Sequence, residues 1–216
     1  MRFILKREEP RSLREYRAVP GAIYNGPNFT SVKTDVRQQL LQEQGYLCCY
    51  CMKRIQDDEL RTKIDHWHCQ DRYPDEQLSY LNLLAACDGN SGFPNNDQHC
   101  DTKKANIDIR YNPSDPSHKE RLQIQYNSLG EIKSIDPTFN YQIDTVLNLN
   151  FSRLTDNRKA ILDAIIDVLH NKQGKRTRAE ISSIIRKWQA RNEEGKLMEY
   201  CGVAIYYLEK KLSKTQ

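Results

Sequence analysis

Residues 62–69, with the sequence Thr-Lys-Ile-Asp-His-Trp-His-Cys, decide the fold. The run from Thr62 to Trp67 predicts a short β-strand, and the apolar run from Leu83 to Cys87 predicts a second one. A short helix is expected to begin near Cys100. The order strand, strand, helix predicts a small ββα unit, and cysteines on both sides of it suggest that a metal ion holds it together.

The chain has seven cysteines, most of them between positions 48 and 100. Their odd number and the lack of a secretory signal predict a reducing, cytoplasmic location, where clustered thiols bind zinc. Cys48 and Cys51 are separated by two residues, and Cys87 and Cys100 by twelve. The longer loop can still close, because loop closure entropy grows only slowly with length. The expected ligands of a structural Zn²⁺ are Cys48, Cys51, Cys87 and Cys100. Cys49 or Cys69 could replace one of them, and burial of the thiols as small apolar side chains is the alternative.

Asp65 and His66 are adjacent at the end of the first expected strand. A neutral histidine can accept a proton from water, and a carboxylate offers hard oxygen ligands to Mg²⁺ or Mn²⁺. Adjacent strand residues point to opposite faces, so both can serve one site only if the strand ends or bulges there. Asn82 opens the second strand, and Asp101 lies in the first turn of the expected helix. Taken singly, each residue also fits a surface pair or a turn.

Five segments together resemble the HNH endonucleases, which have a ββα-metal core and a zinc knuckle. They are Cys48-x-x-Cys51, Ile64-Asp65-His66, Asn82-Leu83-Leu84, Cys87 and Cys100-Asp101-Thr102-Lys103-Lys104. More narrowly, the chain looks like the HNH proteins found beside retrons and in Septu anti-phage systems. Its start is similar to theirs over Lys6-x-x-Glu9-Pro10-x-x-Leu13-x-x-Tyr16.

The resemblance implies that His66 is the general base that activates water and that Asp65 binds the catalytic metal ion. It also implies that Asn82 fixes the loop between the two strands. Asp101 stands where many family members have Asn or His, and it would be the metal ligand carried by the helix. The alternatives for that ligand are His99 and Asn106, and the residues expected to contact the substrate are Lys103 and Lys104.

The resemblance therefore predicts an endonuclease that hydrolyses phosphodiester bonds of nucleic acid, as the effector of a bacterial anti-phage system. It implies an ATPase partner of the ABC or SMC type and, in retron systems, a reverse transcriptase with its DNA–RNA hybrid. The chain has no Walker-type Gly-rich loop, so ATP dependence would come from a partner. The alternatives are a zinc-clamped nucleic-acid binding module and an adaptor without catalysis, against which the Asp65-His66 pair argues.

The sequence predicts an α+β fold in which the ββα core is followed by a β-hairpin and a mainly helical C-terminal region. The expected segments are an N-terminal arm (1–33), the nuclease core with its zinc knuckle (34–112), the hairpin and linker (113–140) and the helical region (141–216). The arm is expected to hold one short strand and a short helix over 13–17. A helix over 34–45 should be capped by Thr34 and ended by Gly45.

Alternating polar and apolar residues over 122–126 and 131–135 predict the hairpin. Helical spacing begins near Tyr141, and two further helices are expected over 178–192 and 196–212. The chain carries a formal net charge of +4, and no apolar stretch is long enough for a membrane span. Positive charge is concentrated in the C-terminal region, where a phosphate backbone or only solvent could face it. These residues are Lys172, Lys175, Arg176, Arg178, Arg186, Lys187 and Arg191.

Overall fold

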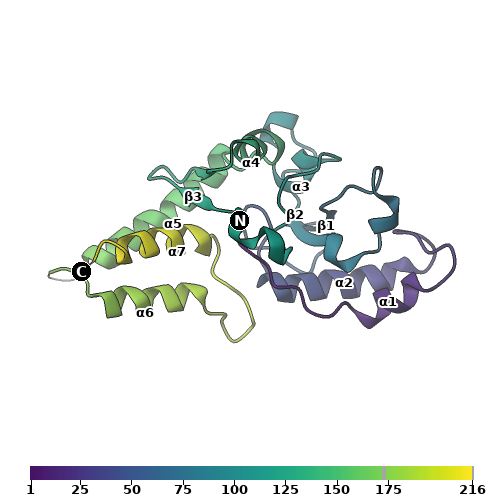
Figure 1. The fold of residues 1–216 in the computed structure, drawn as a ribbon, viewed down its shortest axis with the longest axis horizontal. Coiled ribbons are helices and arrows are strands. Elements are labelled where there is room, and N and C mark those ends of the chain that lie inside the picture. The colour runs from purple at the N-terminus through teal and green to yellow at the C-terminus, as the bar shows by residue number, and fades with distance from the viewer. Residues whose placement is uncertain (172–173, 216) are drawn as a thin grey trace.

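The computed structural model describes residues 1–171 and 174–215, and it shows a mixed α+β protein with two small antiparallel sheets. The helices are α1 (Arg11–Arg17), α2 (Phe29–Gln44), α3 (Cys100–Lys104), α4 (Pro137–Tyr141), α5 (Ser152–His170), α6 (Arg178–Gln189) and α7 (Cys201–Leu212). The strands are β1 (Thr62–His66), β2 (Leu83–Cys87), β3 (Ile124–Tyr126) and β4 (Ile132–Ser134). Figure 1 shows α1, α2 and the β1–β2 sheet towards one end of the molecule and α5, α6 and α7 towards the other. None of the described helices is long and apolar enough to cross a membrane.

The start of α2 differs from the expectation, and its end confirms it. Thr34 does not cap the helix, because it lies inside α2 and its hydroxyl donates to the Thr30 carbonyl at 3.2 Å. The helix begins after Asn28, which has a left-handed φ of 63°, and the buried Phe29 anchors the first turn. Gly45 ends α2 with a φ of 63°, the conformation that favours glycine at a helix end.

The predicted strand, strand, helix order is present as β1, β2 and α3. The two strands pair antiparallel, with Asp65 opposite Leu84 and His66 opposite Leu83. β2 is buried along its whole length because α2 and α3 both contact it. β1 ends at His66, so the strand end that a shared Asp65–His66 site requires is present.

The hairpin is confirmed, with β3 and β4 shorter than the alternating pattern suggested. Its turn contains Gly130 at a φ of 80°, and a Cβ there would lie 2.3 Å from the Thr155 carbonyl oxygen of α5. The short arm helix is also present as α1. The expected arm strand is absent from residues 1–33, all of which the structure describes; instead, Ile4 donates a single backbone hydrogen bond to Pro113 at 2.8 Å.

Two parts of the expected helical region are not helical. The chain turns between a π-helical segment (Gln142–Val146) and α5, where Asn148 has a left-handed φ of 47°. The last helix starts at Cys201 and not at position 196, because the preceding segment is bonded to the cysteine knuckle. Leu197 donates to the Gly45 carbonyl at 3.1 Å and Tyr200 to the Met52 carbonyl at 3.0 Å. Residues 197–200 therefore pack against the loop that carries the first cysteine pair.

The main hydrophobic core is shared by the arm, α2, the ββα unit, the hairpin and the start of α5. A smaller cluster fills the space between the three long C-terminal helices; its buried members are Ile165, Leu169, Ile181, Ile185, Ala204 and Leu208. The main core holds the β1–β2 sheet and α3 in a fixed position relative to the loop that carries Cys48 and Cys51. Of the basic residues expected on the C-terminal region, Lys172 lies outside the described residues.

Candidate active site and cysteine cluster

Four buried cysteines, those expected as zinc ligands, meet at one point. Cys48 and Cys51 come from the knuckle after α2, Cys87 from the end of β2 and Cys100 from the start of α3. Their sulfur atoms all lie within 4.8 Å of one another. The Sγ atoms of Cys48 and Cys100 are 3.8 Å apart, as are those of Cys51 and Cys87.

These separations fit a tetrahedral zinc site. With Zn–S bonds of about 2.3 Å, a regular tetrahedron places its sulfur atoms about 3.8 Å apart. A disulfide would need about 2.05 Å, and all seven thiols are free. Burial raises the pKa of the Cys48 thiol, but hydrogen bonds from Cys100 and its neighbours outweigh burial and lower that pKa well below its usual range. The donor set therefore fits Zn²⁺, with the four ligands that the sequence predicted.

The alternative ligands lie outside this cluster. Cys49 and Cys69 are buried but do not belong to the group of four. Cys69 accepts a contact of 3.4 Å from the Arg72 side chain. His99 lies beside the cluster, with its Nδ1 atom 3.1 Å from the Cys100 sulfur. His99 is therefore a neighbour of the zinc ligands and does not lie with the acidic residues, which weakens it as the alternative catalytic ligand.

The twelve residues between Cys87 and Cys100 form a loop that folds back on itself. His99 donates to the Gly89 carbonyl at 3.0 Å, and the Asn90 side chain donates to the Asp97 carbonyl at 2.8 Å. Gly89 has a φ of 56°, and a Cβ there would lie 2.1 Å from the His99 carbonyl oxygen. Glycine thus allows the loop to close and brings its two cysteines together.

Asp65 is a buried carboxylate with two protein partners, and only 3% of the residue is exposed. The Lys104 amino group donates to its Oδ1 at 2.9 Å and to the His66 carbonyl at 2.9 Å. The Tyr50 hydroxyl donates to its other oxygen, Oδ2. Lys104 itself is 1% exposed, so its expected contact with nucleic acid is wrong for this conformation. Its charge is used inside the protein to balance Asp65.

Asp101 lies close to Asp65. Burial, followed by the negative charge of Asp65, raises the pKa of Asp101 to about 8. The Lys63 amino group is 3.9 Å from its Oδ2 atom. Two neighbouring carboxylates repel each other, and a hard divalent cation such as Mg²⁺ or Mn²⁺ removes that repulsion. Asp65 and Asp101 are therefore the two carboxylates that could hold such an ion.

His66 lies at the end of β1 and is 7% exposed. Its Nε2 atom is 3.0 Å from the Gln77 carbonyl, which can only accept, so Nε2 carries the proton. The Gln70 amide nitrogen is 3.1 Å from the remaining nitrogen, Nδ1, and 3.0 Å from Nε2, so it lies against the ring and not on the Nδ1 lone pair. Burial lowers the pKa of His66, so the ring is neutral near pH 7. A neutral ring with a basic Nδ1 can accept a proton.

The Tyr24 ring covers this histidine. The two ring centroids are 4.5 Å apart in an edge-to-face arrangement, and the Tyr24 amide donates to the Gln77 side chain at 2.9 Å. Burial, and then the charges of Asp101 and Asp65, raise the pKa of the Tyr24 hydroxyl. The arm thus contributes one side chain that adjoins both the base and the carboxylates.

The Asn82 side chain forms hydrogen bonds with the loop that joins β1 and β2. Its side-chain oxygen accepts from the His68 amide at 2.7 Å, and its nitrogen donates to the carbonyls of His68 and Glu76 at 2.9 and 3.3 Å. Its own carbonyl accepts from the Trp67 amide at 2.9 Å. The bonds match the loop-fixing role that the family resemblance implies.

The remaining candidates lie around this site. His68 is stacked between Trp67 and Tyr73 and bonds Glu76 at 2.9 Å, so its ring takes part in the loop's packing. Lys103 donates to the Asn95 carbonyl at 2.9 Å. The Asn106 side chain donates to Asp71 on the surface. In this conformation these partners give neither residue a direct contact with Asp65 or His66.

The sequence did not indicate four contacts of the site, which come from Tyr24, Tyr50, Gln70 and Gln77. Tyr50 stands between the two cysteines of the knuckle, which was the one available signal. Among the described residues, the cysteines form a compact group of three or more metal-binding side chains, whereas Asp65, His66 and Asp101 do not form a second one. No protein-family model matches the chain, and curated proteins give no significant match.

Proposed function

We propose that this protein is a metal-dependent endonuclease of the HNH type that hydrolyses phosphodiester bonds of nucleic acid. One observation carries the proposal: the ββα unit places a neutral histidine, two neighbouring carboxylates and an asparagine-bonded loop beside a buried four-cysteine cluster. A nucleic-acid binding module has no need of a buried base next to a pair of carboxylates.

In this proposal each side chain has a separate task. His66 takes a proton from water at Nδ1 while the Gln77 carbonyl holds its Nε2–H. Asp65 and Asp101 hold Mg²⁺ or Mn²⁺, which supplies positive charge to the scissile phosphate when bound. Asn82 keeps the loop after β1 in place, so that His66 keeps its orientation.

The cysteine cluster takes no part in the chemistry. A zinc ion there would join the knuckle, β2 and α3, which are the elements that carry or flank the carboxylates. Small segments that bury little apolar surface depend on such ions for their shape. The zinc therefore fixes the distance between β1 and α3 indirectly, through β2.

Substrate access requires local movement. The Gln70 amide lies against the His66 ring, Tyr24 covers the same ring, and Lys104 and Tyr50 occupy the oxygens of Asp65. Water and the metal ion must displace some of these groups. The described conformation is thus the closed form of the proposed enzyme.

The wider role follows from the sequence resemblance. The nuclease would act as the effector of a bacterial anti-phage system, with an ABC- or SMC-type ATPase and, in a retron system, a reverse transcriptase with its DNA–RNA hybrid. A partner of this kind could displace the arm from His66, which would link activation to the closed geometry.

The second candidate is a zinc-clamped nucleic-acid binding or adaptor module without catalysis. The buried Asp65–Lys104 ion pair favours it, because both oxygens of Asp65 already have protein partners. In this alternative Asp65 serves only the packing of α3 on β1.

Replacing His66 separates the two candidates, and His68 provides a matched control two positions away. Purified protein is incubated with plasmid, single-stranded DNA and structured RNA in the presence of Mg²⁺ or Mn²⁺, alone and with its partner. His66→Ala should lower the cleavage rate at least 100-fold, as expected for loss of a general base, while zinc content and circular dichroism stay unchanged. His68→Ala should keep most of the activity. Cleavage by His66→Ala at the native rate would refute the assignment of His66 as the general base. If only His68→Ala lost cleavage, His68 would be the general base instead.

A further inference from the structure

A groove lies between the β3–β4 hairpin, α5 and α7, away from the site described above. It encloses about 620 Å³, and Leu162, Ile166 and Val203 line it from α5 and α7. Its polar lining contains no carboxylate. The cations that line it are Lys133, Lys210, Lys211 and Lys214.

These four lysines, called the lysine groove below, are exposed and have no ion-pair partner among the described residues. Lys159 and Lys196 are paired elsewhere on the surface, with Asp163 at 2.6 Å and with Glu194, whereas the exposed Lys53 and Lys119 also have no ion-pair partner among the described residues. What sets these four lysines apart is that they gather around one groove whose described lining residues include no carboxylate.

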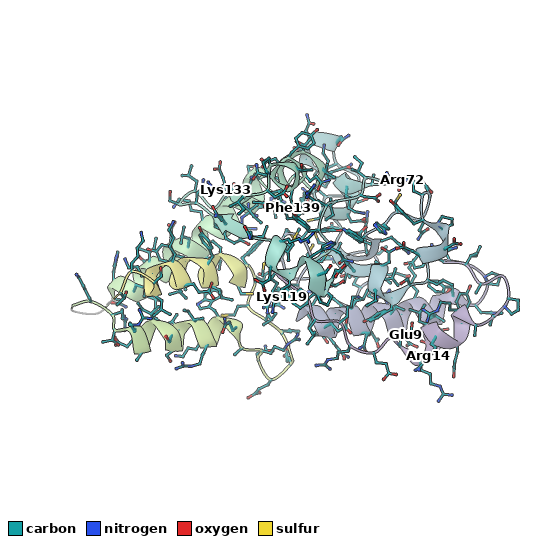
Figure 2. All side chains as sticks on the ribbon, in the orientation of Figure 1. Glu9, Arg14, Arg72, Lys119, Lys133 and Phe139 are labelled. Carbon is teal, nitrogen blue, oxygen red and sulfur yellow. The ribbon has the colours of Figure 1, made fainter. Side chains whose placement is uncertain are left out.

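Helix stability accounts for only part of this arrangement. Lys210 and Lys211 lie in the last turn of α7, where cations offset the helix dipole. Lys133 comes from β4, a different element, and is directed outward beside α5 (Figure 2). A lysine on the hairpin does nothing for the dipole of α7, so the common feature is the groove itself.

Aromatic rings alternate with these charges. Tyr206 and Tyr207 line the groove and are half-buried, and the Lys210 amino group lies 5.9 Å from the centre of the Tyr206 ring. Tyr206 is in turn held edge-on by the buried Tyr126 at 5.8 Å. Lysines interleaved with fixed aromatic rings are the combination that binds single-stranded nucleic acid, through phosphate contacts and base stacking.

The positive surface continues past the end of α7. Lys211 and Lys214 also line a second cavity of about 1280 Å³ together with Lys175, Arg176 and Arg178. Arg176 is paired with Glu180 at 3.7 Å, but no described residue that lines the cavity contributes a carboxylate. A ligand that uses both cavities must be an extended polyanion and not a single phosphate group.

We propose that the lysine groove binds the sugar–phosphate backbone of a single nucleic-acid strand, with a base stacked on Tyr206. This inference rests on the proposed function in one respect, because the strand would be part of the nuclease substrate. The groove would hold the strand, and the ββα unit would cut it.

The test measures binding in buffer without added Mg²⁺ or Mn²⁺, so that cleavage does not occur and the zinc is kept, with a fluorescein-labelled 20-nucleotide single strand of DNA or RNA as the probe. Substitution of Lys133, Lys210 and Lys211 together by Gln should weaken binding tenfold or more and reduce the salt slope by about 2. Substitution of the same residues by Arg should preserve binding. The control is Lys159→Gln on α5, which removes one paired surface charge and should leave affinity within about twofold. Tyr206→Ala should weaken binding severalfold, and Tyr206→Phe should not.

Three outcomes would overturn the inference: unchanged affinity in the triple Gln variant, an equal loss in Lys159→Gln, or equally tight binding of poly-glutamate. The last would indicate an acidic protein as the ligand. Failure of the groove and failure of the nuclease are distinguishable. Native cleavage with unchanged affinity in the triple variant refutes the groove alone, whereas groove-dependent binding without any cleavage by the native protein refutes the nuclease alone.

Discussion

The cysteine cluster and the Asp65–His66 site belong to the same ββα unit but are partnered in opposite ways. In the cluster the four sulfur atoms face one another at the spacing of a tetrahedral ion site. At the other site, Lys104 and Tyr50 occupy the oxygens of Asp65, and the Gln70 amide lies against the His66 ring. The comparison shows that one small fold can leave four thiols facing one another while it gives a nearby carboxylate and imidazole protein partners.

The difference follows from the two kinds of task. A structural ion must stay bound, so its ligands need only each other. A reactive site must exchange water, ion and substrate, and any carboxylate or imidazole buried there needs a temporary partner to offset desolvation. Lys104 is such a partner of Asp65 in the described conformation.

The largest effect is expected from loss of a zinc ligand. Structural zinc contributes roughly 10 kcal/mol or more to folding, so Cys51→Ala should release the ion and unfold the knuckle. Zinc content measured by elemental mass spectrometry and unfolding followed by circular dichroism check this. Cys69→Ala is the matched control, because Cys69 is equally buried but lies outside the cluster; it should keep its zinc. A folded, zinc-loaded Cys51→Ala protein would assign the fourth ligand to another residue.

An intermediate effect is expected from breaking the Asp65–Lys104 pair. Lys104→Met leaves the Asp65 carboxylate buried without its counter-ion, which costs about 3–5 kcal/mol. Denaturant unfolding measures the loss, and adding Asp65→Asn should recover part of it. Mg²⁺ should stabilise Lys104→Met more than the native protein, since the ion can take the place of the amino group. Equal stabilisation of both proteins by Mg²⁺ would mean that Asp65 serves packing and not metal binding.

A third effect is expected from Asp101 and depends on pH. Its pKa is raised to about 8 in the folded protein, from an ordinary value of 3.8. The folded state therefore favours the protonated acid, and the associated stability, full below pH 3.8, is lost as the pH rises towards 8 and above. Without added Mg²⁺ the Tm of the native protein should fall relative to Asp101→Asn between pH 4 and 9, and Mg²⁺ should remove the difference. Parallel curves for the two proteins would show that the pKa of Asp101 is not raised in the folded protein.

The elements of the ββα unit and the four zinc ligands could be predicted from the sequence, because their signals are local. Apolar runs fix β1 and β2, and thiol spacing selects Cys48, Cys51, Cys87 and Cys100. The hairpin and the long helices could be predicted in the same way, from the regular spacing of apolar residues along the chain. What these signals have in common is that they depend on near neighbours in the chain.

The partners of the reactive side chains could not be predicted, because they come from distant segments. Tyr24 reaches His66 from the arm, and Lys104 reaches Asp65 across 39 positions. The last helix began later than predicted for the same reason, since residues 197–200 gave up helical bonds for contacts with the knuckle. Sequence spacing contains no record of such tertiary partners.

The contact between residues 197–200 and the knuckle also orders events during synthesis. Glu199 accepts from the Arg54 amide at 2.5 Å, and the two residues are 145 positions apart. A ribosome that has just made all four cysteines still has to add this clamp, so the chain can collect zinc long before the knuckle is braced. The segment that braces the knuckle therefore emerges only after α5 and α6, and α7 follows it in the chain.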